Sequence, residues 1–155
     1  MFSPSRDETR RFFFDTWAKH HRGETLSGME KLALEIIGLH PEYHALLDAP
    51  ERHLDRDYVP ESGDINPFLH LSLHLAVEEQ LSIDQPPGIR ALYQRLLQKT
   101  GSEHDAKHAV LECLGETIWQ AQRLHTAPDP KIYLECLEKK ACQEFVGRVC
   151  DKLLK

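Results

Sequence analysis

The sequence contains no apolar run as long as the roughly 18–20 residues that cross a membrane. Residues 1–11 are polar and charged, so we expect no secretory signal there. The chain also lacks a phosphate-binding loop, a dinucleotide fingerprint, a nucleophile elbow and zinc-finger spacing. We therefore expect no membrane association, and the sequence leaves open whether the chain is an enzyme.

An excess of positive charge is missing as well. The chain has 19 Lys and Arg against 25 Asp and Glu, which gives a formal net charge of −6 with histidine neutral. Nucleic acids and acidic membrane surfaces attract basic proteins. We therefore expect neither as a partner, whereas a protein partner or a second copy of the chain stays open.

Cysteine is scarce, and no Cys-x-x-Cys pair occurs. The four residues are Cys113, Cys136, Cys142 and Cys150. Without an export signal, such thiols are expected to stay reduced and to act as small apolar side chains on helices. The sequence thus predicts a cytoplasmic protein.

The length and composition are those of a folded domain. Of the 155 residues, 41% are hydrophobic and 28% are charged. A chain of this length buries enough surface to fold without a disulfide or a metal. We predict one domain over residues 1–155.

Start and stop signals indicate helices throughout the chain. Ser27 and Glu30 have the spacing of a capping box, while Asn66-Pro67 and Asp129-Pro130 each combine a capping side chain with a helix-starting proline. We predict an all-α, single-domain helical bundle of about six helices. The C-terminal helix in residues 128–155 could form an appendage to it.

Residues 68–75 are ambiguous, because polar and apolar side chains alternate there with the period of a strand. The apolar pattern continues to Leu81 without alternation, and Asn66-Pro67 precedes the segment. We therefore predict a helix over residues 66–81.

Histidine is the unusual component, with 10 residues. Three segments contain two histidines four residues apart, followed by an acidic residue four positions later. They are His40-His44-Asp48, His70-His74-Glu78 and His104-His108-Glu112. Four residues make about one helical turn, so each set would lie on one helix face.

The second set has the strongest pattern. At about 100° per residue, His70, His74 and Glu78 share an arc that apolar side chains flank. A buried carboxylate is costly unless it is paired or bound to a metal. His108 and Glu112 lie beside an apolar face in the same way, with His104 and His44 as further candidates. The His40 set is the weakest, because His40 could simply cap a helix.

Two functions are compatible with these patterns. One is a helical protein that binds one or two metal ions between helices through His-x-x-x-His/Glu clusters. Imidazole and carboxylate are ligands for zinc, iron or manganese, and the predicted ligands are His70, His74, Glu78, His104, His108, Glu112 and His44. The alternative is a non-enzymatic interaction module whose histidines form structural hydrogen bonds. Haem binding through one histidine is a weaker third possibility.

Several segments also resemble a known family. They are residues 1–6, 11–14, 40–44, 66–90 and 103–123. Together they are similar to a bacterial family catalogued as domain of unknown function 1841, over residues 1 to about 125. The resemblance implies a bacterial protein, but the family name says nothing about an activity. More loosely, the spaced histidines and glutamates resemble the ligand pairs of hemerythrin-like metal bundles, whose full ligand set is not evident here.

Overall fold

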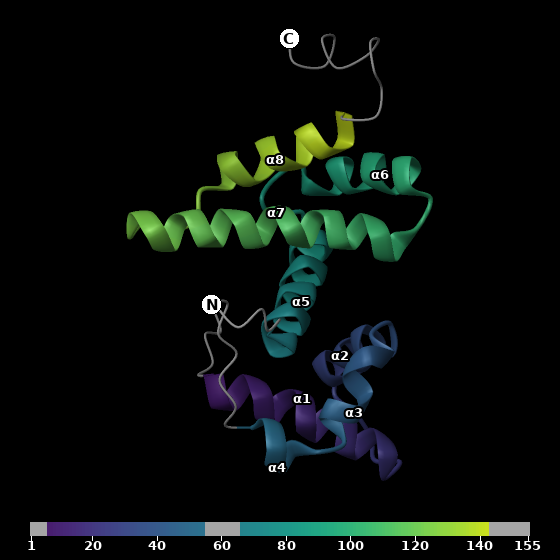
Figure 1. The fold of residues 1–155 in the computed structure, drawn as a ribbon. Helices are drawn as coiled ribbons and strands as arrows, with labels where there is room; N and C mark the ends of the chain where they lie inside the picture. Colours follow the sequence, from purple (N-terminus) through teal and green to yellow (C-terminus); the bar gives the residue numbers. More distant parts are fainter. Residues whose placement is uncertain (1–5, 55–65, 143–155) are drawn as a thin grey trace. The chain divides into compact units, whose positions relative to one another are not determined.

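A computed structural model describes residues 6–54 and 66–142, in which all regular structure is helical (Figure 1). This confirms the predicted all-α class. Six of the described α-helices have more than ten residues, in agreement with the prediction, and the rest are single turns. The chain divides into two compact units, Met1–Leu75 and Ala76–Lys155, so the predicted single domain stays a prediction.

The first unit is built around an aromatic core. Its elements are α1 (Arg6–His21), α2 (Gly28–Gly38), the 3₁₀-helix η1 (Pro41–Tyr43), α3 (His44–Leu47), α4 (Pro50–His53) and the first part of α5 (Pro67–Ile83). The core side chains are Phe13, Phe14, Trp17, Ala33, Ile36, Ile37, Leu47, Phe68 and Leu71. Burial of the aromatic residues of α1 agrees with their apolar spacing in the sequence.

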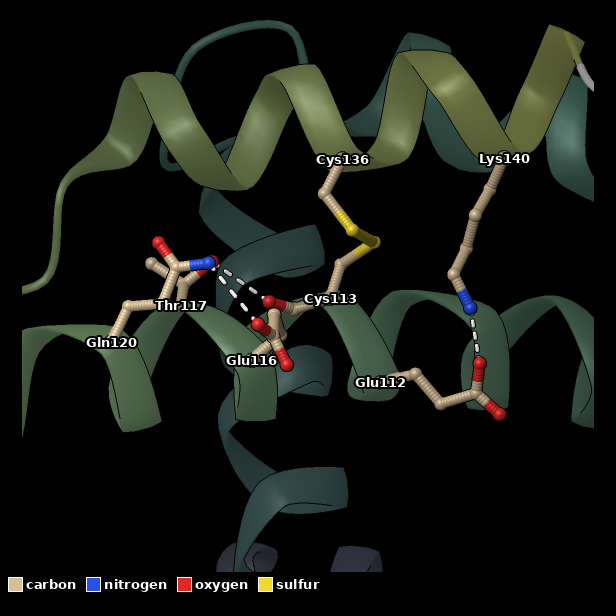
Figure 2. Close-up of a disulfide and its surroundings, with 7 residues drawn as sticks. All are labelled: Glu112, Cys113, Glu116, Thr117, Gln120, Cys136 and Lys140. Carbon is tan, nitrogen blue, oxygen red and sulfur yellow. Dashed lines mark hydrogen bonds and ion pairs between the residues drawn. A yellow bond between two sulfur atoms is a disulfide. The ribbon is translucent and has the colours of Figure 1, made fainter.

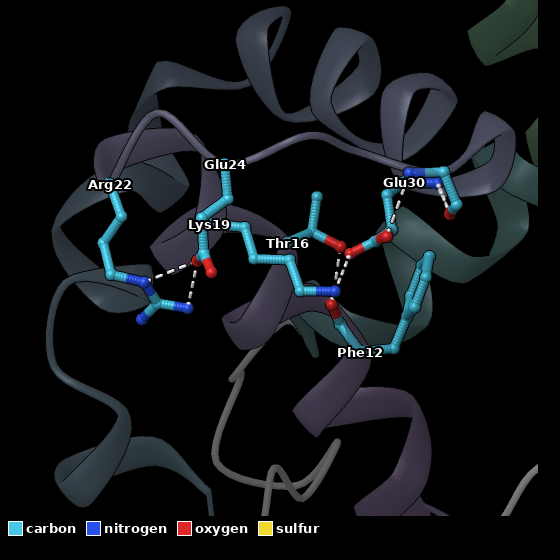
Figure 3. Close-up of polar contacts among 7 residues, drawn as sticks. Phe12, Thr16, Lys19, Arg22, Glu24 and Glu30 are labelled. Carbon is cyan, nitrogen blue, oxygen red and sulfur yellow. Dashed lines mark hydrogen bonds and ion pairs between the residues drawn. The ribbon is translucent and has the colours of Figure 1, made fainter.

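Helix α2 begins with the capping box that the sequence predicts. The Ser27 hydroxyl accepts from the Glu30 N–H at 3.3 Å, and a Glu30 carboxylate oxygen accepts from the Ser27 N–H at 3.1 Å. The other Glu30 oxygen lies 2.9 Å from the Lys19 ammonium of α1 (Figure 3). A single carboxylate therefore caps α2 and joins it to α1.

Helix α5 settles the ambiguous segment. Asn66 Oδ1 accepts from the backbone N–H of Phe68 at 3.0 Å and of Leu69 at 3.1 Å, as a helix cap does. Leu69 is 56% exposed and Leu71 is fully buried, although both would lie on one face of a strand. The predicted helix is confirmed.

The second unit contains the rest of α5 with α6 (Ile89–Thr100), α7 (Glu103–Leu124) and α8 (Pro130–Cys142). Helices α6, α7 and α8 pack against one another (Figure 1). Tyr133 and Leu137 of α8 are buried, and the Tyr133 hydroxyl donates to Gln80 Oε1 at 2.7 Å. The described part of residues 128–155 thus contributes to the core of this unit.

A disulfide joins α7 to α8, contrary to the prediction of reduced thiols. It links Cys113 and Cys136, whose Cα atoms lie 5.7 Å apart (Figure 2). The prediction is wrong for this pair because two packed helices bring together cysteines that are 23 residues apart in sequence, a separation that gives no local signal. Cys142 is outside this disulfide.

The sequence also indicates a capping box beginning at Ser5 and a long loop over residues 49–65. Ser5, most of that loop and Cys150 lie outside the described residues. No helix among the described residues has the length and apolar character needed to cross a membrane.

Candidate metal centre

Two elements of the first unit supply a cluster of histidines. His70 and His74 lie one turn apart on α5, and His40 lies between α2 and η1. The His40 N–H donates to the Ile37 carbonyl at 3.0 Å, and the His40 carbonyl accepts from the Tyr43 N–H at 3.0 Å. Backbone hydrogen bonds on both sides therefore fix the position of His40.

The three imidazoles converge through their Nε2 atoms. His74 Nε2 lies 2.9 Å from His40 Nε2 and 3.2 Å from His70 Nε2. One potential ligand atom of each ring lies within 4.8 Å of the others. His40 and His74 are each only 2% exposed, so the ring nitrogens meet in a largely dry environment. We call these three residues the histidine cluster.

Residues of η1 surround the His40 ring. Glu42 Oε1 lies 2.9 Å from His40 Nδ1, and the Tyr43 ring stacks on His40 with centroids 5.4 Å apart. Burial opposes ionisation of Glu42, but a hydrogen bond with His40 and a backbone hydrogen bond outweigh it and lower the pKa of this carboxyl. Burial, with the nearby charge of Glu42, raises the pKa of Tyr43, so this side of the cluster carries one anion and one neutral phenol.

This arrangement could hold a metal ion. A neutral imidazole has one ring nitrogen with a lone pair, which is the usual protein ligand of zinc, iron and copper. One ring nitrogen from each of the three histidines meets the others here, and the carboxylate of Glu42 lies on the opposite edge of the His40 ring.

His44 is not part of the histidine group that could hold a metal. Its Nε2 lies 2.9 Å from the Ile37 carbonyl oxygen. A carbonyl only accepts, so His44 Nε2 must donate. The His44 ring also packs on Trp17, with centroids 4.6 Å apart. These contacts give His44 a structural role.

The other predicted ligands belong to the second unit, and each glutamate there contacts a lysine. Glu78 Oε1 lies 2.5 Å from Lys107 Nζ, and Glu112 pairs with Lys140 (Figure 2). Burial would lower the pKa of Lys107, but the hydrogen bond and charge of Glu78 outweigh it and raise that pKa. Both carboxylates thus have a cation that compensates their charge.

His104 and His108 do pair on α7, with ring centroids 4.1 Å apart. Their spacing of one helical turn explains this contact. A metal site between helices would require His108 and Glu112 to face the histidines of α5, and this arrangement stays a prediction.

His40 is the one residue of the histidine cluster that its spacing in the sequence does not predict as a ligand. Its spacing from His44 indicates a shared helix face only if the helix is continuous, but Pro41 follows directly. A residue before proline avoids the helical conformation, and His40 has φ −126° and ψ 66°. The His40-Pro41 pair was therefore the available signal that His40 projects in a direction of its own.

Comparisons with known proteins give one result. Searches of the curated proteins and of the solved structures gave no match. Residues 5–139 match a family model described as "Domain of unknown function (DUF1841)", which extends past residue 125 into α8. Because this match spans most of the chain, the protein belongs to the DUF1841 family.

Proposed function

We propose that the protein binds a divalent transition-metal ion through His40, His70 and His74. Two of these residues, His70 and His74, are ligands that the sequence predicts. The observation that carries the proposal is the convergence of three Nε2 atoms at one place in the first unit.

Hydrogen-bond chemistry supports this proposal. A neutral ring nitrogen carries either one proton or one lone pair and so makes one linear hydrogen bond. His74 Nε2 faces two ring nitrogens, at 2.9 Å and 3.2 Å. An ion bound between them would use a lone pair of every ring.

The spacing of the nitrogens is also close to that of a metal site. With bonds of about 2.0–2.1 Å and tetrahedral angles, two nitrogen ligands lie about 3.3 Å apart. The observed separations of 2.9 Å and 3.2 Å require only small side-chain shifts to reach this value.

The donor set favours some metals over others. Imidazole suits zinc and iron, while carboxylate, carbonyl and water suit manganese and magnesium. The histidine cluster contributes only imidazole nitrogens, so we expect zinc or iron(II) to bind more tightly than manganese.

The alternative is that the histidines form a structural network in a non-enzymatic interaction module. Two observations favour it: the His40–His74 separation of 2.9 Å fits an ordinary N–H···N hydrogen bond, and the carboxylates Glu78 and Glu112 pair with lysines. In this case a protein partner or a second copy of the chain would be the ligand, and metal would have no effect.

Metal analysis of protein purified without an affinity tag separates the two functions. We expect the protein to bind about one zinc or iron(II) ion tightly enough to raise its melting temperature, because a ligand of the folded state stabilises by mass action. His74→Ala should abolish this binding. His20→Ala, which removes an exposed histidine of α1, is the matched control and should retain it.

A wild-type protein that binds no ion and gains no thermal stability from zinc, iron or manganese would refute the proposal and favour the structural network. His108→Ala tests the sequence prediction for the second unit, since a ligand at that position would be needed for full affinity. A second ion that His104→Ala removes and His74→Ala retains would show a separate site on α7.

A further inference from the structure

We propose that Glu42 is a positioning residue, which holds His40 in the tautomer that presents an Nε2 lone pair to the histidine cluster. This inference rests on the proposed metal site and adds a residue that the spacing of histidines and acids does not single out. Glu42 lies on η1, next to Pro41 and two positions from His40.

The proton on the His40 ring decides whether this residue can be a ligand. A neutral imidazole has its proton on Nδ1 or on Nε2, and only the other nitrogen can bind a metal. In solution both tautomers are populated. A site that needs Nε2 as ligand therefore gains affinity when a neighbour holds the proton on Nδ1.

Glu42 meets this requirement by geometry. Its Oε1 lies 2.9 Å from His40 Nδ1, and an ionised carboxylate can only accept a hydrogen bond. His40 Nδ1 must then donate, which leaves the lone pair on Nε2. That atom lies 2.9 Å from His74 Nε2, on the side of the cluster.

The two partners of this hydrogen bond differ in their exposure to solvent. His40 is 2% exposed, whereas the Glu42 side chain is 57% exposed. The carboxylate thus stays hydrated while it contacts a buried ring. Tyr43, stacked on the same ring at an interplanar angle of 20°, limits its rotation.

The tautomer of His40 also determines that of His74 before an ion binds. If His40 Nε2 is an acceptor, the short contact to His74 requires His74 Nε2 to donate its proton. For His74 Nε2 to serve as a ligand, that proton would have to move to His74 Nδ1, which would leave the imidazole ring neutral. Glu42 thus leaves His40 ready to bind without rearrangement.

Two measurements test the proposal. In metal-free protein, long-range ¹H–¹⁵N NMR should find His40 protonated on Nδ1, and Glu42→Ala should give a mixture of tautomers. In competition with a chromophoric chelator, Glu42→Ala should weaken zinc binding by about 10–100-fold. Glu42→Gln should weaken it less, because an amide oxygen can still accept from Nδ1. Glu35→Gln, at an exposed glutamate of α2, is the matched control and should change neither measurement.

The outcomes separate this inference from the metal site itself. If the wild-type protein binds neither zinc nor iron nor manganese, the proposed function fails, and the NMR measurement still decides the tautomer. If it binds zinc but Glu42→Ala binds within about twofold as tightly, the positioning role is overturned. Protonation of His40 on Nε2 in the wild-type protein would overturn it as well.

Discussion

The histidines of the first unit have different roles, and His44 is the clearest example. It lies four positions from His40, yet it donates to the Ile37 carbonyl and packs on Trp17. We expect His44→Ala to leave zinc binding unchanged and to lower the free energy of unfolding by about 1 kcal/mol, the net worth of a hydrogen bond.

Urea denaturation and zinc titration of the same His44→Ala sample check this expectation. His44→Asn is the companion variant, since its amide can still donate a hydrogen bond and should recover part of the stability. A loss of zinc binding in His44→Ala with unchanged stability would instead make His44 a ligand, as its spacing in the sequence suggests.

The sequence predicts part of the histidine cluster for a clear reason. Spacing of four residues reports a shared face only within a continuous helix, which holds for His70 and His74 on α5. It fails at His40, because Pro41 ends the helical conformation there. For Glu78, the contact with Lys107 comes from another helix, and no spacing along the chain reveals such a neighbour.

At the level of elements, helix starts are predictable because their signals are local. Ser27 and Asn66 each accept a hydrogen bond from the first turn of a helix, as the sequence indicates, and Ser102 does the same at the start of α7. Gly101 ends α6 in the left-handed conformation, with φ 71°, where other residues are strained. The Cys113–Cys136 pair lies beyond such reasoning, because it depends on how α7 and α8 pack.

The link between α1 and α2 gives an element-scale prediction about pH. In the folded state the pKa of Glu30 lies below its ordinary value of 4.5. The backbone hydrogen bond from Ser27 is the largest cause, and the hydrogen bond from Lys19 is the second. The folded protein therefore binds fewer protons than the unfolded chain near this pH. We expect the stabilising effect of Glu30 to be complete above pH 4.5 and to be lost as the pH falls through the lowered value.

Urea denaturation at a series of pH values between about 3 and 6 measures this contribution. Glu30→Gln should flatten the dependence on pH and should be less stable than the wild-type protein near pH 6. Glu35→Gln, on the same helix, provides the comparison. Equal slopes for wild-type and Glu30→Gln protein would contradict the assignment.

At the scale of the whole molecule, each unit has its own long-range link. The histidine cluster lies in the first unit, and the Cys113–Cys136 disulfide lies in the second. The disulfide also removes the argument from reduced thiols for a cytoplasmic location. With a sequence separation of 23 residues, loop-closure entropy implies a stabilisation of about 3 kcal/mol.

A metal bound to the histidine cluster would stabilise the folded state, whereas a disulfide restricts the unfolded chain. Removing the metal and reducing the disulfide should therefore destabilise different units. We expect a chelator to lower amide hydrogen-exchange protection in α2 and in α5 up to Leu75. A dithiol reductant, which converts the disulfide to two thiols and is itself oxidised, should lower protection in α7 and α8. Peptide-resolved mass spectrometry measures both effects.

Replacing Cys113 and Cys136 together by alanine should reproduce the effect of the reductant, whereas Cys142→Ser should not. If both reagents loosened the same peptides, the two units would unfold as one and this division of the links would be wrong.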